Sequence, residues 1–318
     1  MLRIERLRLL IGAAFLLLLA PLLILGLRPL AEAAELGSAP TSAPLASHPC
    51  GGLAAGQVPI KHVVWIWMEN HSYRQIIGSR QAPYENALAK QCGLAANYHA
   101  IAHPSLPNYL AATGGSTFGI TGDRVPPGRA ISASSIFSEM SASGRQWRTY
   151  VESMSGNCQP TGVHGFGRNP VTFFDASHPL CSSWDVPLGT PRSGALATAL
   201  RTNSLPAFSL VVPNLCHATH SCPVSTGDAW LSRWINRIVT SPSYRQGGTA
   251  VFLTWDEGKR RIGQRVPLIV VSPATVPGTI SRVRYTHYSL LRTTAQLLGV
   301  VPPGHAASAT SLRTPFGL

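Results

Sequence analysis

Acidic side chains are scarce in this sequence. It contains 13 Asp and Glu residues against 26 Lys and Arg residues, so its formal net charge is +13. A basic surface attracts anionic partners over long range, but the arginines are scattered and no basic stripe is interleaved with aromatic residues. We therefore expect no nucleic-acid partner. The sequence also lacks a P-loop and a G-x-G-x-x-G segment after a strand, which argues against a nucleotide cofactor.

Two further motifs are missing. No G-x-S-x-G elbow occurs, which disfavours acyl transfer, although a Ser-His-Asp set and hence a serine esterase stay open. No Cys-x-x-Cys pair occurs, which disfavours a zinc site. An even number of cysteines in an exported chain suggests disulfides. Because the spacings are short, we expect the sequential pairing of the six cysteines: Cys50–Cys92, Cys158–Cys181 and Cys216–Cys222.

A long apolar run lies close to the N-terminus. Residues 9–27 are apolar, follow a segment rich in arginine, and precede the small-x-small pattern Ala31-Glu32-Ala33. This arrangement predicts an export signal over residues 1–33, with cleavage after Ala33. The run of 19 residues is also long enough to stay as a membrane anchor. Either alternative places the body of the protein outside the cytoplasm, secreted or in the cell envelope.

The rest of the chain has the pattern of one α/β domain over residues 58–318. Residues 34–57 are rich in Ala, Ser, Pro and Gly and predict a flexible linker. Short apolar runs typical of buried strands alternate with helical patterns, which predicts a single, mostly parallel sheet flanked by helices. Residues 152–190 predict a long irregular insertion. Strands are expected at 62–68, 207–212, 249–255 and 266–271, and helices at 83–90, 131–143, 193–202, 228–238 and 286–298.

Three of the predicted strands end in oxygen-bearing side chains. Glu69 and Asn70 follow the first, Asn214 follows the second, and Asp256 and Glu257 follow the third. If these strands are parallel, their carboxyl ends share one edge of the sheet, where ligands bind in α/β proteins. Carboxylate and amide oxygens there would hold a hard divalent cation. For one strand alone, a simple loop start or helix cap would be the better interpretation.

Ser105 lies between Pro104 and Pro107, where a helix cannot simply run through. We expect it on a turn at the start of a helix, with amide N–H groups nearby. A serine beside a metal ion becomes a better nucleophile, because the cation favours its alkoxide. The alternative is an ordinary serine N-cap.

The sequence resembles a bacterial phosphoesterase family that includes acid phosphatases and phospholipases C and has an alkaline-phosphatase-like α/β fold. The similarity extends over about residues 60–300. Six stretches carry it in the family's order: VVWIWMENHSY (63–73), ANYHAIAHPSLPNY (96–109), VPNLC (212–216), GDAWL (227–231), FLTWDEG (252–258) and THYSLLRT (286–293).

The resemblance implies roles for individual residues. Ser105 would be the nucleophile beside one divalent metal ion of unknown identity. The chain departs from the family at His217-Ala218-Thr219-His220, where relatives often read Asn-Asp-Met-His, and at Arg168, where they often carry His. Arg168 would instead clamp a phosphate bidentately. The implied metal ligands are Glu69, Asn70, Asp256 and Glu257, the phosphate-side histidines His103, His220 and His287, and the substrate-binding residues Arg168, Asn108, His217 and Asn214.

These patterns together predict an exported, metal-dependent phosphoesterase that uses a serine nucleophile and resembles acid phosphatases. Its partner would be a small phosphorylated or phospholipid substrate, with membrane association through the N-terminal segment. Three alternatives stay open: a phospholipase C or phosphodiesterase acting on lipid head groups, a secreted serine esterase, and an envelope binding protein without catalysis. For each histidine, a helix cap or a bond to backbone is the structural alternative.

Overall fold

The structure is a computed structural model that describes residues 41–46, 48–123, 130–159, 169–259 and 263–318. The predicted export segment and Arg168 lie outside the described residues, so both stay predictions. Among the described residues, eight strands form one sheet and three form a second. The strands are β1 (His62–Met68), β2 (Gly93–Ala95), β3 (Tyr98–His99), β4 (Trp147–Val151), β5 (Asp185–Pro187), β6 (Phe208–Val212), β7 (Thr249–Trp255), β8 (Arg265–Val266), β9 (Leu268–Val271), β10 (Thr279–Ser281) and β11 (Tyr285–Thr286).

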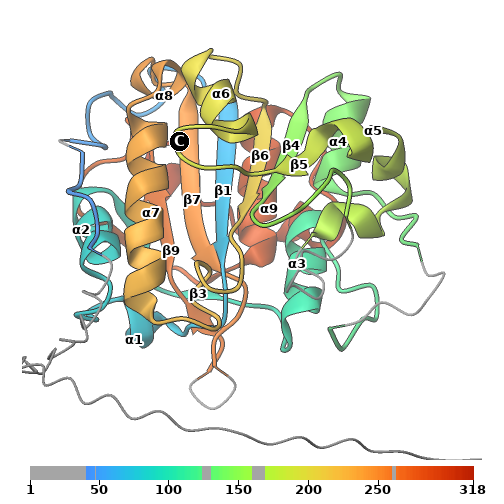
Figure 1. Cartoon of the computed structure of the whole chain (residues 1–318), viewed down its shortest axis with the longest axis horizontal. Coiled ribbons are helices and arrows are strands. Elements are labelled where there is room, and N and C mark those ends of the chain that lie inside the picture. The colour runs from blue at the N-terminus through green and yellow to red at the C-terminus, as the bar shows by residue number, and fades with distance from the viewer. Residues whose placement is uncertain (1–40, 47, 124–129, 160–168, 260–262) are drawn as a thin grey trace, which may run out of the picture. The chain divides into compact units, whose positions relative to one another are not determined.

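Helices cover both faces of the large sheet (Figure 1). One layer consists of α2, α6, α7 and α8, and the other of α3, α4 and α9. The α-helices are α1 (Tyr73–Ile76), α2 (Pro83–Gln91), α3 (Ser105–Gly114), α4 (Ile136–Ala142), α5 (His178–Trp184), α6 (Ala195–Arg201), α7 (Val224–Val239), α8 (Pro242–Arg245) and α9 (His287–Leu298). The 3₁₀ turns are η1 (Pro170–Phe173), η2 (Asp175–Ser177), η3 (Gly304–Ser308) and η4 (Thr314–Phe316).

The large sheet is mostly parallel, which confirms the predicted fold class. Its strand order is β10-β2-β9-β7-β1-β6-β4-β5. β1 lies at the centre and pairs in parallel with β6 and β7. Its residues from Val63 to Met68 are buried on both faces, because helices cover both sides, and this explains the unbroken apolar run. The carboxyl ends of β1, β6 and β7 therefore meet at one edge of the sheet.

A smaller sheet with the order β11-β3-β8 lies at that same edge, below β1 in Figure 1. β3 pairs in parallel with β11 and antiparallel with β8. Each strand has only two residues. β3 leads into α3, β8 lies between β7 and β9, and β11 leads into α9.

The helix boundaries follow local capping chemistry. Helix α9 begins after Thr286, which forms a capping box with Ser289, and it ends at Gly299 in the left-handed region, as predicted. Helix α4 begins at residue 136 rather than 131, because Ser135 accepts a hydrogen bond from the Ser138 N–H and caps the helix there.

Two sequence predictions need correction. The segment 152–190 is not irregular throughout, because its described part contains η1, η2, α5 and β5. Residues 41–46, predicted as part of a flexible linker, are bonded to α7. The Ser42 hydroxyl donates to Asp228, the Ala43 N–H donates to the Ser232 hydroxyl, and the Ala46 N–H donates to Asn236. Alanine, serine and proline, typical of linkers, here form a strap along a helix.

The three disulfides have the predicted sequential pairing: Cys50–Cys92, Cys158–Cys181 and Cys216–Cys222. The third joins two cysteines that are six residues apart in the sequence, in the loop that follows β6. Within the part of the chain that the structure describes, no helix has the length and apolar character needed to cross a membrane.

Candidate active site

The predicted strand ends meet as expected. Glu69 follows β1, and Asp256 and Glu257 follow the neighbouring β7; these three carboxyl side chains are at most 2% exposed. The Asp256 N–H donates to the Met68 carbonyl, which fixes the two strand ends side by side. Asp256 Oδ1 accepts hydrogen bonds from the backbone N–H groups of Asn70, at 3.0 Å, and Glu257, at 2.7 Å. The sheet thus concentrates three acids in one buried place.

Ser105 lies in this cluster, at the first position of α3, as its flanking prolines predict. It is 3% exposed, and its Oγ donates to Glu69 Oε2 at 3.2 Å. One turn later, the Tyr109 hydroxyl donates to Glu69 Oε1 at 2.6 Å. Because residues four apart lie on the same face of a helix, α3 presents the serine and the tyrosine to one carboxylate. The Leu106 N–H, next to Ser105, donates to Asp123 Oδ1 at 3.1 Å.

The electrostatics of the cluster favour a bound cation. The pKa of Asp256 is raised well above 3.8, first by burial and then by the negative charges of Glu69 and Glu257; the Asn70 N–H and the Ser105 side chain oppose this shift. Asp256 Oδ2 is buried and has no hydrogen-bond partner among the described residues. An oxygen donor set with an unused buried carboxylate oxygen fits a hard divalent cation.

Two of the predicted histidines lie at the cluster in different ways. His103 Nδ1 is 2.6 Å from Glu257 Oε2, and its side chain is 35% exposed. His287 is fully buried, with Nε2 2.6 Å from the Asp256 carbonyl oxygen and Nδ1 2.8 Å from the Tyr98 hydroxyl. Burial lowers the pKa of His287 to about 4. Both of its ring nitrogens have partners, and His287 contacts the backbone of Asp256; its role as a phosphate contact stays a prediction.

Two residues predicted to bind substrate instead organise loops. Asn108 is fully buried; its Oδ1 accepts from the N–H groups of Ile101 and Ala102, and its Nδ2 donates to the carbonyls of Ala102 and Pro104. A carboxamide makes four hydrogen bonds at most, so none is left for a substrate. Asn214 Oδ1 accepts from the Cys216 and His217 N–H groups at the beginning of the loop after β6, and its Nδ2 donates to the Ser153 hydroxyl. Its substrate contact stays a prediction.

His217 lies in a separate polar group at the carboxyl ends of β4 and β6. Its Nδ1 is 2.9 Å from both carboxylate oxygens of Glu152, and its ring stacks on Trp230 at 6.0 Å between centroids. The Trp230 Nε1–H also donates to Glu152 Oε1, at 3.1 Å. His220 is exposed on the same disulfide-closed loop.

The sequence prediction missed several residues around Glu69. His71 is 8% exposed, with Nδ1 3.1 Å from the Glu69 carbonyl oxygen; burial is the largest cause that lowers its pKa. The Thr219 hydroxyl donates to the same carbonyl at 3.1 Å and accepts from Trp255 Nε1–H at 3.2 Å. Thr219 has a φ of 70°, unusual for a β-branched residue. No sequence pattern signals such contacts, since the residues come from distant segments.

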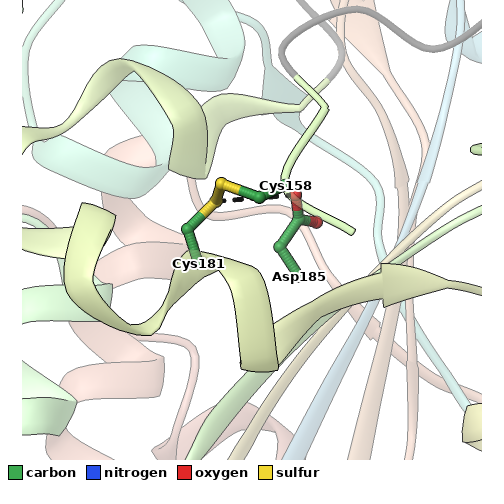
Figure 2. Close-up of side chains that lie close together, drawn as sticks. All are labelled: Cys158, Cys181 and Asp185. Atoms are coloured by element: carbon green, nitrogen blue, oxygen red, sulfur yellow. Dashed lines mark hydrogen bonds between the residues drawn. A yellow bond between two sulfur atoms is a disulfide. The ribbon is translucent and has the colours of Figure 1, made fainter. Parts of the chain in front are cut away.

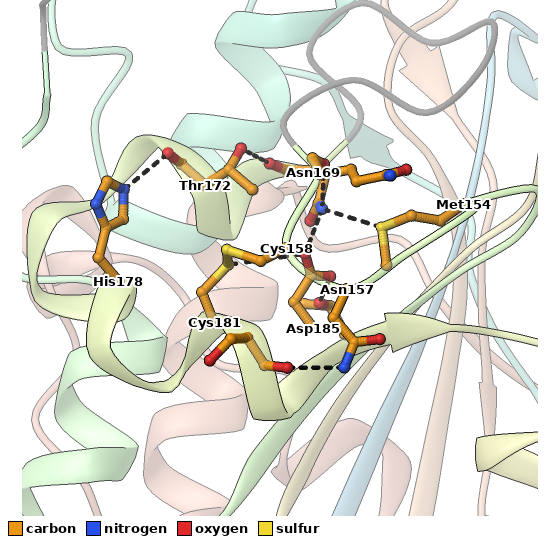
Figure 3. Close-up of a disulfide and its surroundings, with 11 residues drawn as sticks. Met154, Asn157, Cys158, Asn169, Thr172, His178, Cys181 and Asp185 are labelled. Carbon is orange, nitrogen blue, oxygen red and sulfur yellow. Dashed lines mark hydrogen bonds between the residues drawn. A yellow bond between two sulfur atoms is a disulfide. The ribbon is translucent and has the colours of Figure 1, made fainter.

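A second group rich in potential metal ligands is not a metal centre. Cys158, Cys181 and Asp185 lie together (Figure 2), but the two sulfurs form a disulfide and cannot act as thiolates. Asp185 instead joins a buried hydrogen-bond network, in which it accepts from Asn169 Nδ2 at 2.7 Å (Figure 3). It also accepts a hydrogen bond from the Thr149 hydroxyl. Burial raises its pKa to about 6.

Comparison with known proteins agrees with this geometry. The profile of the Phosphoesterase family matches residues 79–301. A phosphatidylinositol-3-phosphatase from Mycobacterium tuberculosis is 29% identical over 269 residues, covering 84% of this chain and 86% of that protein. An acid phosphatase from Aspergillus fumigatus is 26% identical, covering 71% of this chain and 52% of its own, so the chain spans about half the length of that fungal relative.

The fold agrees with a solved structure. A protein in the alkaline phosphatase superfamily from Vibrio parahaemolyticus superposes with a TM-score of 0.58 at 14% identity, covering 81% of this chain and 72% of that one. Because the family profile matches most of the chain and the relatives are named phosphatases, the chain is an enzyme of the phosphoric ester hydrolase class and belongs to the Phosphoesterase family.

Proposed function

We propose that the chain is a metal-dependent phosphoesterase in which Ser105 is the nucleophile. The observation that carries this proposal is the position of Ser105 Oγ, 3.2 Å from Glu69 in a buried cluster that also contains Asp256 and Glu257. A hydroxyl among crowded carboxylates is poorly suited to attack an anionic ester unless positive charge is supplied. The buried Asp256 Oδ2, without a partner among the described residues, supports such a cation site.

Glu69, Asn70, Asp256 and Glu257 would hold the metal ion. When bound, it supplies positive charge that favours the serine alkoxide and offsets the charge of the phosphate oxygens. Asn70 has a φ of 57°, a left-handed conformation that asparagine tolerates well. His71 and Thr219 both contact the carbonyl oxygen of Glu69 and keep the end of β1 in place.

The chain's own residues perform the remaining steps. Ser105 Oγ passes its proton to Glu69 and attacks phosphorus, so that an Oγ–P bond forms and the bond between phosphorus and the leaving oxygen breaks. His103, oriented by Glu257, gives a proton to that oxygen. Water then gives a proton to His103 and attacks the phosphoserine. The Oγ–P bond breaks, phosphate is released, and Ser105 Oγ takes back the proton from Glu69.

The test is hydrolysis of 4-nitrophenyl phosphate and bis(4-nitrophenyl) phosphate by the purified protein, with and without a chelator. We expect a loss of turnover in chelator and its recovery when single divalent cations are added back. Ser105→Ala should lose turnover by a thousandfold or more, on the order of the loss for catalytic nucleophiles, while Ser204→Ala, an exposed serine at the opposite sheet edge, should retain it. Acid quenching with labelled substrate should leave phosphate on the peptide that contains Ser105. Turnover that survives both chelator and Ser105→Ala would overturn the proposal.

A phosphoinositide is the second candidate substrate, because the mycobacterial relative is named a phosphatidylinositol-3-phosphatase. The preferred ester in the same assay separates a monoesterase from a diesterase or phospholipase C. We further propose that the protein acts outside the cytoplasm, supported by three disulfides and by the apolar N-terminal run.

A further inference from the structure

The small sheet beside the site has one buried and one open face. In the register of its strands, His99 lies directly opposite Arg265 of β8 and Thr286 of β11. Side chains alternate along a strand and paired residues share a face, so His99, Arg265 and Thr286 point to the same side. The alternate residues Tyr98 and Tyr285 are at most 1% exposed, whereas His99, Arg265 and Thr286 are partly exposed.

This open face is positively charged. The Arg265 guanidinium lies 4.0 Å above the Tyr73 ring, and its Nε is buried without a hydrogen-bond partner among the described residues. Arg284, two residues before Thr286, is exposed. The pKa of His99 is lowered first by burial and then by the positive charges of Arg284 and Arg265, in agreement with the pairing of His99 with Arg265. No carboxylate forms an ion pair with either arginine in the described part of the chain.

The connections of the small sheet keep its strands close to the proposed active site. His99 precedes His103 by four residues, so the two Cα atoms lie within about 14 Å of each other. Tyr73, under the Arg265 guanidinium, follows Asn70 by three residues, which limits that separation to about 11 Å. The Ala100 N–H donates to the Gln264 carbonyl at 2.9 Å, which continues the β3–β8 pairing toward the carboxylate cluster.

We propose that Arg265 and Arg284 bind a second phosphate group of the substrate while the first is hydrolysed at Ser105. This inference rests on the proposed function and specifies its substrate class. The substrates are esters with two phosphate groups, of which one is a monoester that Ser105 attacks. Arginine suits this role because its planar guanidinium binds phosphate oxygens bidentately. The contact of Arg265 with the face of the Tyr73 ring restrains its guanidinium before the substrate binds. The second phosphate group would be either a monoester of a soluble compound or the phosphodiester of a lipid head group.

The experiment compares two soluble substrates that differ by one phosphate group, myo-inositol 3-phosphate and myo-inositol 1,3-bisphosphate. A third substrate, dioleoyl phosphatidylinositol 3-phosphate in detergent micelles, carries the second group as a diester. The variants are Arg265→Gln, Arg284→Gln and their combination. Arg201→Gln is the matched control, since it removes one positive charge from an exposed position at the opposite edge of the sheet. The quantity measured is the ratio of kcat/KM for each two-phosphate substrate to that for myo-inositol 3-phosphate.

We expect this ratio to exceed one in the unmodified protein and to fall about tenfold for each arginine removed, mainly through KM, since a charge-assisted contact of this kind corresponds to about that factor. Arg201→Gln should leave the ratio unchanged. If the ratio falls with the soluble bisphosphate, the arginines bind a phosphate group whether or not it belongs to a lipid. If the ratio falls only with the micellar lipid, they bind the phosphodiester of the lipid head group. Equal ratios in the unmodified protein and the double variant, with both substrates, would overturn this inference. Loss of all hydrolysis in Ser105→Ala tests the proposed function separately.

Discussion

The contact between Tyr109 and Glu69 allows a sharp test of how the proposed metal site is built. Tyr109 is 1% exposed, and its hydroxyl donates to Glu69 Oε1 at 2.6 Å. Tyr109→Phe removes this hydroxyl and leaves the ring in place against Trp67. Glu69 then loses a donor in a buried place beside the carboxyl groups of Asp256 and Glu257.

The expected cost follows from the type of hydrogen bond. A bond to a charged group contributes about 1.5–3 kcal/mol to stability, so we expect the free energy of unfolding to fall by about 2 kcal/mol in the absence of metal. That loss corresponds to a decrease in melting temperature of roughly 4–8 °C for a domain of this size. Residues that orient a metal ligand typically change metal affinity about 10–100-fold, so the Kd for a divalent cation should rise within that range.

The assay is urea unfolding of metal-free protein, followed by titration calorimetry with divalent cations. Tyr150→Phe provides a matched control, because Tyr150 is also fully buried but its hydroxyl has no hydrogen-bond partner among the described residues. Removing an unsatisfied hydroxyl should be neutral or slightly stabilising. If both variants lose the same stability, or if Tyr109→Phe binds metal as tightly as the unmodified protein, the reasoning about Glu69 is refuted.

Two further predictions concern other parts of the fold. Burial raises the pKa of Asp185 from 3.8 to about 6, so the folded protein retains a proton that the unfolded chain releases between these values. The associated stability is present below pH 4 and is lost as pH rises through 6, by up to about 3 kcal/mol; Asp185→Asn should abolish this loss in urea titrations at pH 4 and 7, and parallel pH profiles would contradict it. In Gly227→Ala, the new Cβ would lie 2.3 Å from Thr219 Cγ2 and 2.9 Å from the His217 carbonyl oxygen, so the loop that holds Glu69 must shift. Turnover should fall although alanine favours a helix by about 1 kcal/mol, whereas Gly248→Ala, with no atom closer than 3.8 Å, should retain turnover; normal activity in Gly227→Ala would show that the loop position is unimportant.

The central strands and the acids at their ends could be predicted from sequence because both leave local signals. An unbroken apolar run predicts a strand covered on both faces, and the polar residue directly after it predicts the edge of the sheet. Parallel pairing of β1, β6 and β7 then brings Glu69 and Asp256 together without further information. The prolines around Ser105 similarly predict the start of α3.

The roles of the surrounding polar residues could not be predicted, because each role depends on which partner tertiary packing supplies. His287 has the same local appearance whether it contacts phosphate or backbone, and only the positions of Tyr98 and Asp256 decide that it is fully bonded. Asn108 belongs to the motif that suggested a substrate contact, yet the turn of residues 101–104 consumes its hydrogen bonds. The contacts of Thr219 depend on a left-handed backbone that its residue type disfavours.

The strap of residues 41–46 sets the side on which the chain enters the described domain. Ser42 is bonded near the beginning of α7, at the edge of the sheet that contains Ser105, and Ala46 is bonded two turns later, toward the opposite edge. The chain therefore enters the domain on the substrate side, whereas the C-terminus lies at the far edge (Figure 1). Immobilisation through the C-terminus would therefore leave the sheet edge that contains Ser105 facing the solution.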